Sequence, residues 1–215
     1  MYWNEKIECM SRDELKQLQL TRLKATVERV YQNVAPYRKA MDEKGIKPQD
    51  IKSLDDVKYL PFTTKYDLRD NYPYGWVSAP MSEIVRTHAS SGTTGKPTVV
   101  CHTQKDVDNW GDLVARGLVM AGGTKNDILQ VCFGYGLFTG GLGLHYGGEH
   151  LGASVIPAST GNTKRQMTLL KDLKTTILVG TPSYALYLAE ALRDAGISPD
   201  ANVKVSLGWL LFRLL

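Results

Sequence analysis

The sequence predicts an α/β fold in which an N-terminal helical segment precedes alternating strands and helices. Apolar residues recur at three- and four-residue steps between Leu20 and Val34, the spacing of one helix face. From residue 84 onward, short β-type runs alternate with longer helical runs, as in a sheet covered by helices. The 215 residues are 43% apolar, which is enough for one sizeable core or two small ones.

The N-terminal segment is predicted to span residues 1–83. Ser11 and Glu14 form a Ser-x-x-Glu capping box, so a helix should begin there and end before Pro36. One face of this helix must pack on another element. Residues 36–80 contain many turn-forming and aromatic residues, and we expect them to be rich in turns.

The α/β part is predicted to span residues 84–206. The expected strands are 84–88, 98–102, 128–132, 153–156, 176–179 and 203–205. The expected helices are 105–120, 140–150, 164–174 and 183–195, with Gly196 closing the last one. Residues 180–184 form either a strand-to-helix turn with Pro182 in the first helical turn or a ligand contact.

A short loop concentrates hydroxyls, glycines and one lysine. Its residues are Ser90, Ser91, Gly92, Thr93, Thr94, Gly95 and Lys96. Glycines let backbone N–H groups turn toward an anion, hydroxyls add neutral donors, and the ammonium supplies a compensating charge. The loop is therefore predicted to bind nucleotide phosphates, between two strands and at the sheet edge where α/β folds bind ligands.

Two better-known glycine-rich signatures do not fit. A Walker A loop needs Gly where Ser90 stands and Ser or Thr where Pro97 stands. A dinucleotide fingerprint starting at Gly134 would need Gly or Ala where Thr139 stands. An ordinary Ser/Thr/Gly turn between strands is the structural alternative for the loop.

Segment 133–148 is rich in glycine and aromatic residues. Tyr135 and Phe138 next to glycines suggest an aromatic or apolar acid pocket, because glycines allow a flat ligand to approach the backbone closely. The alternative is a tightly packed turn and helix start with the aromatics in the core. His145 lies in the same segment, either as a hydrogen-bonded structural residue or orienting a carboxylate.

Composition argues against several function classes. Residues 1–80 carry 14 basic and 12 acidic side chains and the rest carry 12 and 10, so no basic block suggests nucleic acid. Three widely spaced cysteines suggest reduced thiols in a cytoplasmic protein. No histidine pair has zinc-site spacing, so no metal ligands are assigned. No apolar run approaches the ~20 residues of a membrane span.

Residues 90–97 fill the pattern Ser/Thr-Ser-Gly-Thr-Thr-Gly-x-Pro, which resembles the phosphate-binding signature of adenylate-forming enzymes. With segments 60–69 and 133–148, the likeness to the phenylacetate-CoA ligase family runs over residues 1–206. The resemblance implies an ATP-dependent ligase that activates an aryl acetic acid as an acyl adenylate and transfers it to coenzyme A, with Mg²⁺ on the nucleotide. It assigns the acid site to Tyr135, Phe138, Gly140 and Gly141.

Members of that family are about twice as long, and their catalytic lysine lies in a C-terminal domain. We therefore expect the C-terminal domain to be absent, no catalytic residue within this chain, and residues 207–215 to be an aberrant apolar tail. A sheet without its partner would favour self-association, as a homodimer or otherwise. A non-catalytic nucleotide-binding or interaction module and a phosphotransferase remain the alternatives. The acid could be phenylacetate, a hydroxyphenylacetate, indoleacetate or another aryl acid.

Overall fold

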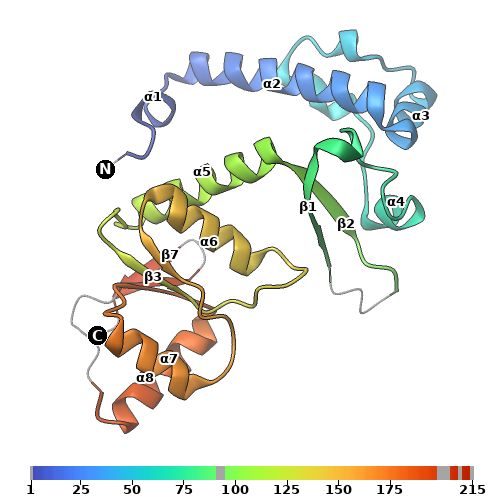
Figure 1. Cartoon of the computed structure of the whole chain (residues 1–215). Coiled ribbons are helices and arrows are strands. Elements are labelled where there is room, and N and C mark those ends of the chain that lie inside the picture. Colours follow the sequence, from blue (N-terminus) through green and yellow to red (C-terminus); the bar gives the residue numbers. More distant parts are fainter. Residues whose placement is uncertain (1, 91–94, 198–203, 208–209, 214–215) are drawn as a thin grey trace. The chain divides into compact units, whose positions relative to one another are not determined.

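The computed structural model describes residues 2–90, 95–197, 204–207 and 210–213, and the chain forms two compact units (Figure 1). One unit is Glu5–Gln104, and the other combines Met1–Asn4 with Lys105–Leu215. The division falls after Gln104, so the first two strands belong with the N-terminal helices. The sequence-based boundary at residue 83 stays a prediction. Each unit is described by itself.

The first unit is mainly helical. Its elements are α1 (Glu5–Glu8), α2 (Arg12–Asn33), α3 (Ala35–Glu43), the 3-10 turns η1 (Pro48–Asp50), η2 (Leu54–Tyr59) and η3 (Met81–Glu83), and α4 (Lys65–Asp70). The predicted capping box starts α2: the Ser11 N–H donates to Glu14 Oε2 at 3.0 Å, and the Glu14 N–H donates to Ser11 Oγ at 3.3 Å. The apolar face of α2 packs as expected, because Val27 is buried with Met41 and Ile51.

Helix α3 was not predicted. Pro36 was interpreted as the end of a helix, and it does follow the end of α2. It also lies in the first turn of α3, where proline is favoured because its missing N–H would have no partner within the helix. The turn-rich stretch expected from residue 36 onward therefore begins with another helix.

Strands β1 (Ile84–Ala89) and β2 (Val99–Thr103) form a separate two-stranded antiparallel sheet. Their register pairs Ala89 with Val99 and Thr87 with Cys101. The connection between them is too short for the crossover that parallel strands need, so the strands form a hairpin. The loop therefore lies between two strands as predicted, but these strands are not part of the larger sheet.

The second unit contains a five-stranded sheet with the order β4-β3-β5-β6-β7. The strands are β3 (Ile128–Val131), β4 (Ser154–Ile156), β5 (Ile177–Val179), β6 (Lys204–Leu207) and β7 (Leu210–Arg213). The helices are α5 (Gln104–Met120), α6 (Gly140–Leu151), α7 (Thr163–Asp172) and α8 (Pro182–Asp194). Strands β3 to β6 are mutually parallel, and β7 runs antiparallel to β6.

Helices cover both faces of this sheet (Figure 1). Ile177 and Val179 of β5 pack with residues of α5 and α6, whereas Leu178 packs with residues of α7 and α8. This alternation follows from the period of two along a strand. Strand β5 is buried on both faces, which explains its continuous apolar sequence.

Six strands and four helices were predicted from residue 84 onward, and the α/β class is confirmed. The structure has an element at each of the ten places, with ends shifted by up to two residues where they are described. Residue 203, the predicted start of the last strand, lies outside the described residues. Strand β7 lies in the segment treated as a tail, and that interpretation of residues 207–215 stays a prediction.

A buried polar network fixes the loop after β4. Gln130 Nε2 donates to Gln166 Oε1 at 2.7 Å, and Thr175 Oγ1 donates to Gln130 Oε1 at 2.7 Å. Gln166 Nε2 in turn donates to the Ser159 carbonyl at 2.8 Å. Ser159 also donates its N–H to the Val131 carbonyl, so the loop is held close to the end of β3. Because buried amides need partners, this network specifies where the loop lies.

Candidate functional site

The first predicted region, loop 90–98, closes the β1–β2 hairpin. The Ser90 N–H donates to the Thr98 carbonyl at 3.0 Å, and the Thr98 N–H donates to Ser90 Oγ at 2.9 Å. These two bonds fasten the base of the loop. Of the predicted phosphate ligands, Ser91, Gly92, Thr93 and Thr94 lie outside the described residues.

The described end of the loop is open. Gly95 has φ +124°, and a Cβ placed there would meet no atom of the described residues within 4 Å. Lys96 is exposed, and its Nζ lies 5.5 Å from the centroid of the Tyr72 ring. A cation above a ring face is attracted to it, which gives the lysine a defined partner. The ammonium group of Lys96 is therefore accessible to an anion at this end of the loop.

The second predicted region, segment 133–148, begins directly after β3. From β3 the chain crosses to β4 on one side, and from β5 it crosses to β6 on the other. The carboxyl ends of β3 and β5 therefore lie next to each other at a topological switch point, the usual ligand position in such sheets. Gly180 follows β5 there, and a Cβ at this position would lie 3.7 Å from Cys132 Cβ. The glycine-rich segment begins at this edge.

Residues 180–184 lie at the same edge and form the expected strand-to-helix turn. Thr181 caps α8, because the Tyr184 N–H donates to Thr181 Oγ1 at 3.4 Å. Pro182 lies in the first turn of that helix. This geometry explains the segment without a ligand.

Most glycines of α6 serve packing. A Cβ at Gly143 would lie 2.5 Å from the Trp110 ring, and one at Gly147 would lie 2.2 Å from Val114 Cγ1. Both partners lie on α5, so the missing side chains allow the two helices to approach each other closely. For this part of the segment, the packing alternative describes the structure.

The four predicted acid-site residues have different environments. A Cβ at Gly141 would lie 2.6 Å from the Gly134 carbonyl oxygen, whereas one at Gly140 would make only an ordinary 3.6 Å contact with Phe133. Phe138 is 69% exposed, so it is not part of the core. Tyr135 is half-buried and packs against the cluster under α5 and α6. The acid-binding role of all four residues stays a prediction.

A hydrogen-bonded chain of three side chains connects this segment to α6. Tyr135 Oη lies 3.3 Å from His145 Nδ1, and His145 Nε2 lies 3.1 Å from Glu149 Oε1. Burial raises the pKa of Tyr135 to about 12, and the nearby Cys132 and Glu149 add to this shift. Sequence reasoning missed Glu149, although its position four residues after His145 on a helix was a readable signal.

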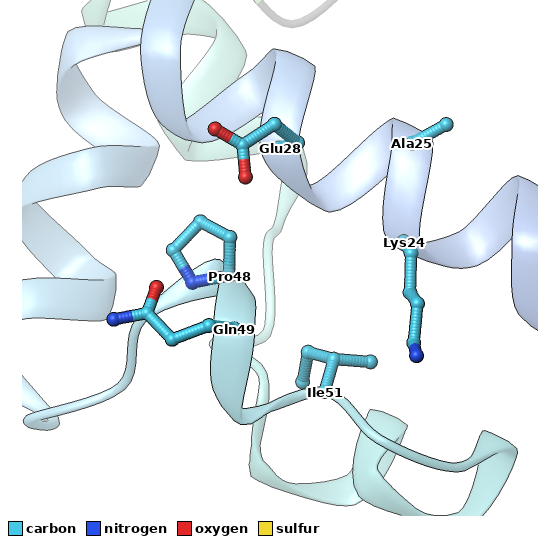
Figure 2. Close-up of a pocket in the computed structure, with 6 residues that line it drawn as sticks. All are labelled: Lys24, Ala25, Glu28, Pro48, Gln49 and Ile51. Carbon is cyan, nitrogen blue, oxygen red and sulfur yellow. The ribbon is translucent and has the colours of Figure 1, made fainter.

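A surface pocket of about 380 Å³ lies elsewhere, in the first unit. Figure 2 shows that it lies between α2 and the η1 turn. Its lining residues are Lys24, Ala25, Glu28, Pro48, Gln49 and Ile51. None of the residues predicted from the motifs lines it, so its volume does not make it the candidate site.

The described residues contain no group of three or more His, Cys, Asp or Glu side chains placed to hold a metal ion. Within the same residues, no helix combines the length and the apolar character that a membrane crossing requires.

Sequence comparison finds closely similar ligases. The chain is 53% identical over 196 residues to the phenylacetate-coenzyme A ligase of Escherichia coli (strain K12), covering 91% of this chain and 45% of that protein. It is 51% identical over 204 residues to the phenylacetate-coenzyme A ligase of Aromatoleum evansii, covering 94% of this chain and 46% of that protein. No family model matches the chain.

Structure comparison agrees. A crystal structure of 2-hydroxyisobutyryl-CoA ligase in complex with 2-HIB-AMP and CoA, in the thioesterification state, matches with a TM-score of 0.86 and 31% identity. The match covers 91% of this chain and 43% of that one. An open conformation of the same enzyme matches with a TM-score of 0.84. In sequence and structure the chain is similar to these CoA ligases, and it spans about half the length of the curated relatives it matches.

Proposed function

We propose that this chain carries the nucleotide- and acid-binding part of a ligase that joins an aryl acetic acid, such as phenylacetate, to coenzyme A at the expense of ATP. The observation that supports this most directly is 47% to 53% identity to phenylacetate-coenzyme A ligases over at least 91% of the chain. A cytoplasmic location follows from the proposal, because ATP and coenzyme A are substrates found there. Self-association of the chain stays a prediction.

The proposed chemistry has two steps. The carboxylate of the acid attacks the α-phosphate of ATP and releases pyrophosphate, which leaves an acyl adenylate. The thiol of coenzyme A then attacks the acyl carbon, a thioester forms and AMP leaves. Negative charge develops on the phosphate oxygens in the first step, so donors fixed around them lower the barrier.

Loop 90–96 is our candidate for holding the β- and γ-phosphates. The open backbone at Gly95 and the exposed Lys96 fit an anion, and the hydroxyls of Ser90, Ser91, Thr93 and Thr94 add neutral donors. The described residues contain no ready carboxylate cluster for Mg²⁺. Mg²⁺ bound with the nucleotide would neutralise charge on the phosphate oxygens.

The acid is proposed to bind at the carboxyl edge of the five-stranded sheet. Tyr135, Phe138, Gly140 and Gly141 lie in the segment that follows β3, at the switch point where such sheets bind ligands. The exposed ring of Phe138 offers an apolar face to an aryl group. No residue of this chain is assigned as a catalytic acid, base or nucleophile.

The test is acid-dependent exchange of labelled pyrophosphate into ATP, together with ATP affinity measured by calorimetry. We expect ATP and phenylacetate both to bind, with exchange at the level of the blank without acid, because no catalytic residue is assigned to this chain. Lys96→Ala should weaken ATP binding by roughly tenfold or more, since a hydrogen bond to a charged group contributes about 1.5–3 kcal/mol. Lys65→Ala is the matched control, because Lys65 also lies over a tyrosine ring but outside the loop.

The alternatives give different results. ATP binding without binding of any aryl acid would support a non-catalytic nucleotide-binding module. Phosphoryl transfer that does not depend on an acid would support a phosphotransferase. ATP affinity that is the same in Lys96→Ala and in the wild type would remove the loop from the proposal.

A further inference from the structure

The lysine of loop 90–96 contacts an aromatic ring from another segment of the first unit. Lys96 Nζ lies 5.5 Å from the centroid of the Tyr72 ring, within the roughly 6 Å at which a ring face attracts a cation. The ring comes from the turn after α4, whereas the lysine comes from the connection between β1 and β2. The contact therefore joins the candidate phosphate loop to a part of the unit that is not next to it in the sequence.

The turn that carries Tyr72 is fixed by its own hydrogen bonds. The Tyr72 N–H donates to the Arg69 carbonyl at 3.2 Å. Asn71 Nδ2 donates to the Asp67 carbonyl at 2.9 Å, and Trp76 Nε1 donates to the same carbonyl at 3.0 Å. Because residues before and after Tyr72 are tied to α4 in this way, the ring is attached to backbone of set position.

The backbone next to Lys96 has less support. Gly95 has φ +124°, and no atom of the described residues would lie within 4 Å of a Cβ there. A lysine side chain loses much rotamer freedom when a ligand fixes its end, and this loss weakens binding. A contact that restricts the side chain before the ligand arrives reduces the loss. The Tyr72 ring is such a contact.

The ring leaves the ammonium group able to bind an anion. The attraction comes from the electron-rich ring face, whereas the three N–H groups of the lysine are the donors that a phosphate needs. Lys96 is exposed, so these donors can be reached from solvent. The ring and a phosphate can thus hold the ammonium group at the same time, which favours positioning by Tyr72 over competition with the ligand.

We propose that Tyr72 is a positioning residue for Lys96: its ring holds the ammonium group at the open end of the loop, so that a nucleotide phosphate meets a lysine that is already restrained. This inference rests on the proposed function, because it takes loop 90–96 as the phosphate site. Tyr72 acts through Lys96, and no contact of its own with the nucleotide is assigned.

The first test needs no ligand. Protons above an aromatic ring resonate upfield, so NMR of the full chain labelled with carbon-13 at lysine Cε reports whether Lys96 lies over Tyr72. We expect an upfield Lys96 signal in the wild type and in Tyr72→Phe, and its loss in Tyr72→Leu. The signal of Lys65, which lies 5.6 Å from the Tyr66 ring centroid, should stay unchanged and shows that α4 is intact. An unshifted Lys96 signal in the wild type would overturn the inference and leave the proposed function untouched.

The second test is ATP affinity of the full chain, measured by calorimetry. Tyr72→Leu should weaken binding roughly two- to fivefold, the range for a cation–ring contact at an exposed site. Tyr72→Phe should bind like the wild type, because it keeps the ring face. In the Lys96→Ala background, Tyr72→Leu should cause no further loss, since the two residues act as one unit in a double-mutant cycle. Tyr66→Leu is the matched control, and its affinity should equal that of the wild type.

The outcomes separate this inference from the proposed function. If Lys96→Ala weakens ATP binding and Tyr72→Leu does not, the positioning role fails while the loop remains the phosphate site. Tighter binding in Tyr72→Leu would mean that the ring competes with the phosphate, and an equal loss with and without Lys96 would mean that Tyr72 acts on its own; either result overturns the inference. If the wild type binds no ATP, or if Lys96→Ala binds it equally well, the loop assignment fails and the inference with it.

Discussion

Loop 90–98 and segment 133–148 are both rich in glycine, yet the structure uses glycine for different reasons in each. Gly95 in the loop has a positive φ, and no atom of the described part of the chain lies within 4 Å of the position of a Cβ. Gly147 on α6 has ordinary helical backbone and a Val114 methyl group 2.2 Å from that position. Glycine thus allows a backbone conformation in one region and a close approach between helices in the other. The same sequence signal has two physical causes, and they respond differently to mutation.

The largest effect is expected for the crowded glycine. Gly147→Ala should lower the free energy of unfolding by roughly 1–3 kcal/mol, the range for overpacking, despite the better helix propensity of alanine. The stiff, β-branched Val114 cannot move aside by a simple change of rotamer. Urea denaturation measures the change.

Two further variants show whether crowding is the cause. Gly136→Ala is the control, because a Cβ there meets nothing within 4 Å, and its stability should stay within about 0.5 kcal/mol of the wild type. Val114→Ala should compensate in part for Gly147→Ala, giving a favourable coupling in a double-mutant cycle. Purely additive effects would show that the helices do not meet at these two residues.

Gly95→Ala should have a smaller effect with a different origin. An L-residue at a positive φ is strained, so we expect a loss of about 1–2 kcal/mol in the stability of the first unit. Among the residues that the structure describes, no side chain lies within 4 Å, so shortening one of them would not relieve the strain. Stability equal to that of the wild type would mean that the backbone at residue 95 adopts another conformation, and the contrast with Gly147 would then disappear.

Much of the fold could be predicted because it depends on local patterns. Ser11 and Glu14 start α2 through their own hydrogen bonds, and the apolar run of β5 identifies a doubly buried strand. Pro36 was misleading because proline both ends one helix and begins the next. Long-range placement was less accessible: the short connection at loop 90–98 favours a hairpin, but nothing near it in the sequence shows that this hairpin is separate from the larger sheet.

The candidate site shows the same limit. The glycines of segment 133–148 were recognised, but whether they make room for a ligand or for a helix depends on Trp110 and Val114, about thirty residues earlier. Tyr135 was recognised as an aromatic residue. Its hydrogen bond to His145 could not be predicted, because it depends on how the chain turns between β3 and α6. Sequence patterns identify which residues matter more readily than which atoms they contact.

Two cysteines report on the two regions separately. Cys132 directly precedes segment 133–148 and is 5% exposed, and burial raises its pKa to about 12. A rise of about three units reduces the thiolate by roughly a thousandfold at neutral pH. Cys101 lies on β2, just after loop 90–98, and is only partly buried. Iodoacetamide should therefore modify Cys101 well before Cys132, as followed by mass spectrometry.

The same labelling sharpens the contrast between the glycines. Gly147→Ala should accelerate labelling of Cys132 and leave Cys101 unchanged, because the strain lies under α6. Gly95→Ala should do the reverse. If both variants accelerate both thiols equally, the two units unfold together, and the regions do not respond independently.

The smallest expected effect is the dependence of the α2 cap on pH. Hydrogen bonds from the side chain and backbone of Ser11 hold the pKa of Glu14 below its usual range. A lowered folded-state pKa means that the stabilisation is fully present above the unfolded value, near 4.3, and is lost as pH falls through the folded value. Glu14→Gln keeps a capping side chain but does not titrate. The free energy of unfolding of this variant, relative to the wild type, should therefore be more favourable at pH 3 than at pH 7, as measured by urea denaturation.

For Tyr135 and Cys132, burial raises the pKa, so their contribution to stability is present below the unfolded values and is lost as pH rises toward about 12. Acid should thus weaken the helical cap of the first unit, and alkali the start of segment 133–148, because hydrogen bonding stabilises a charge in one and burial excludes it in the other.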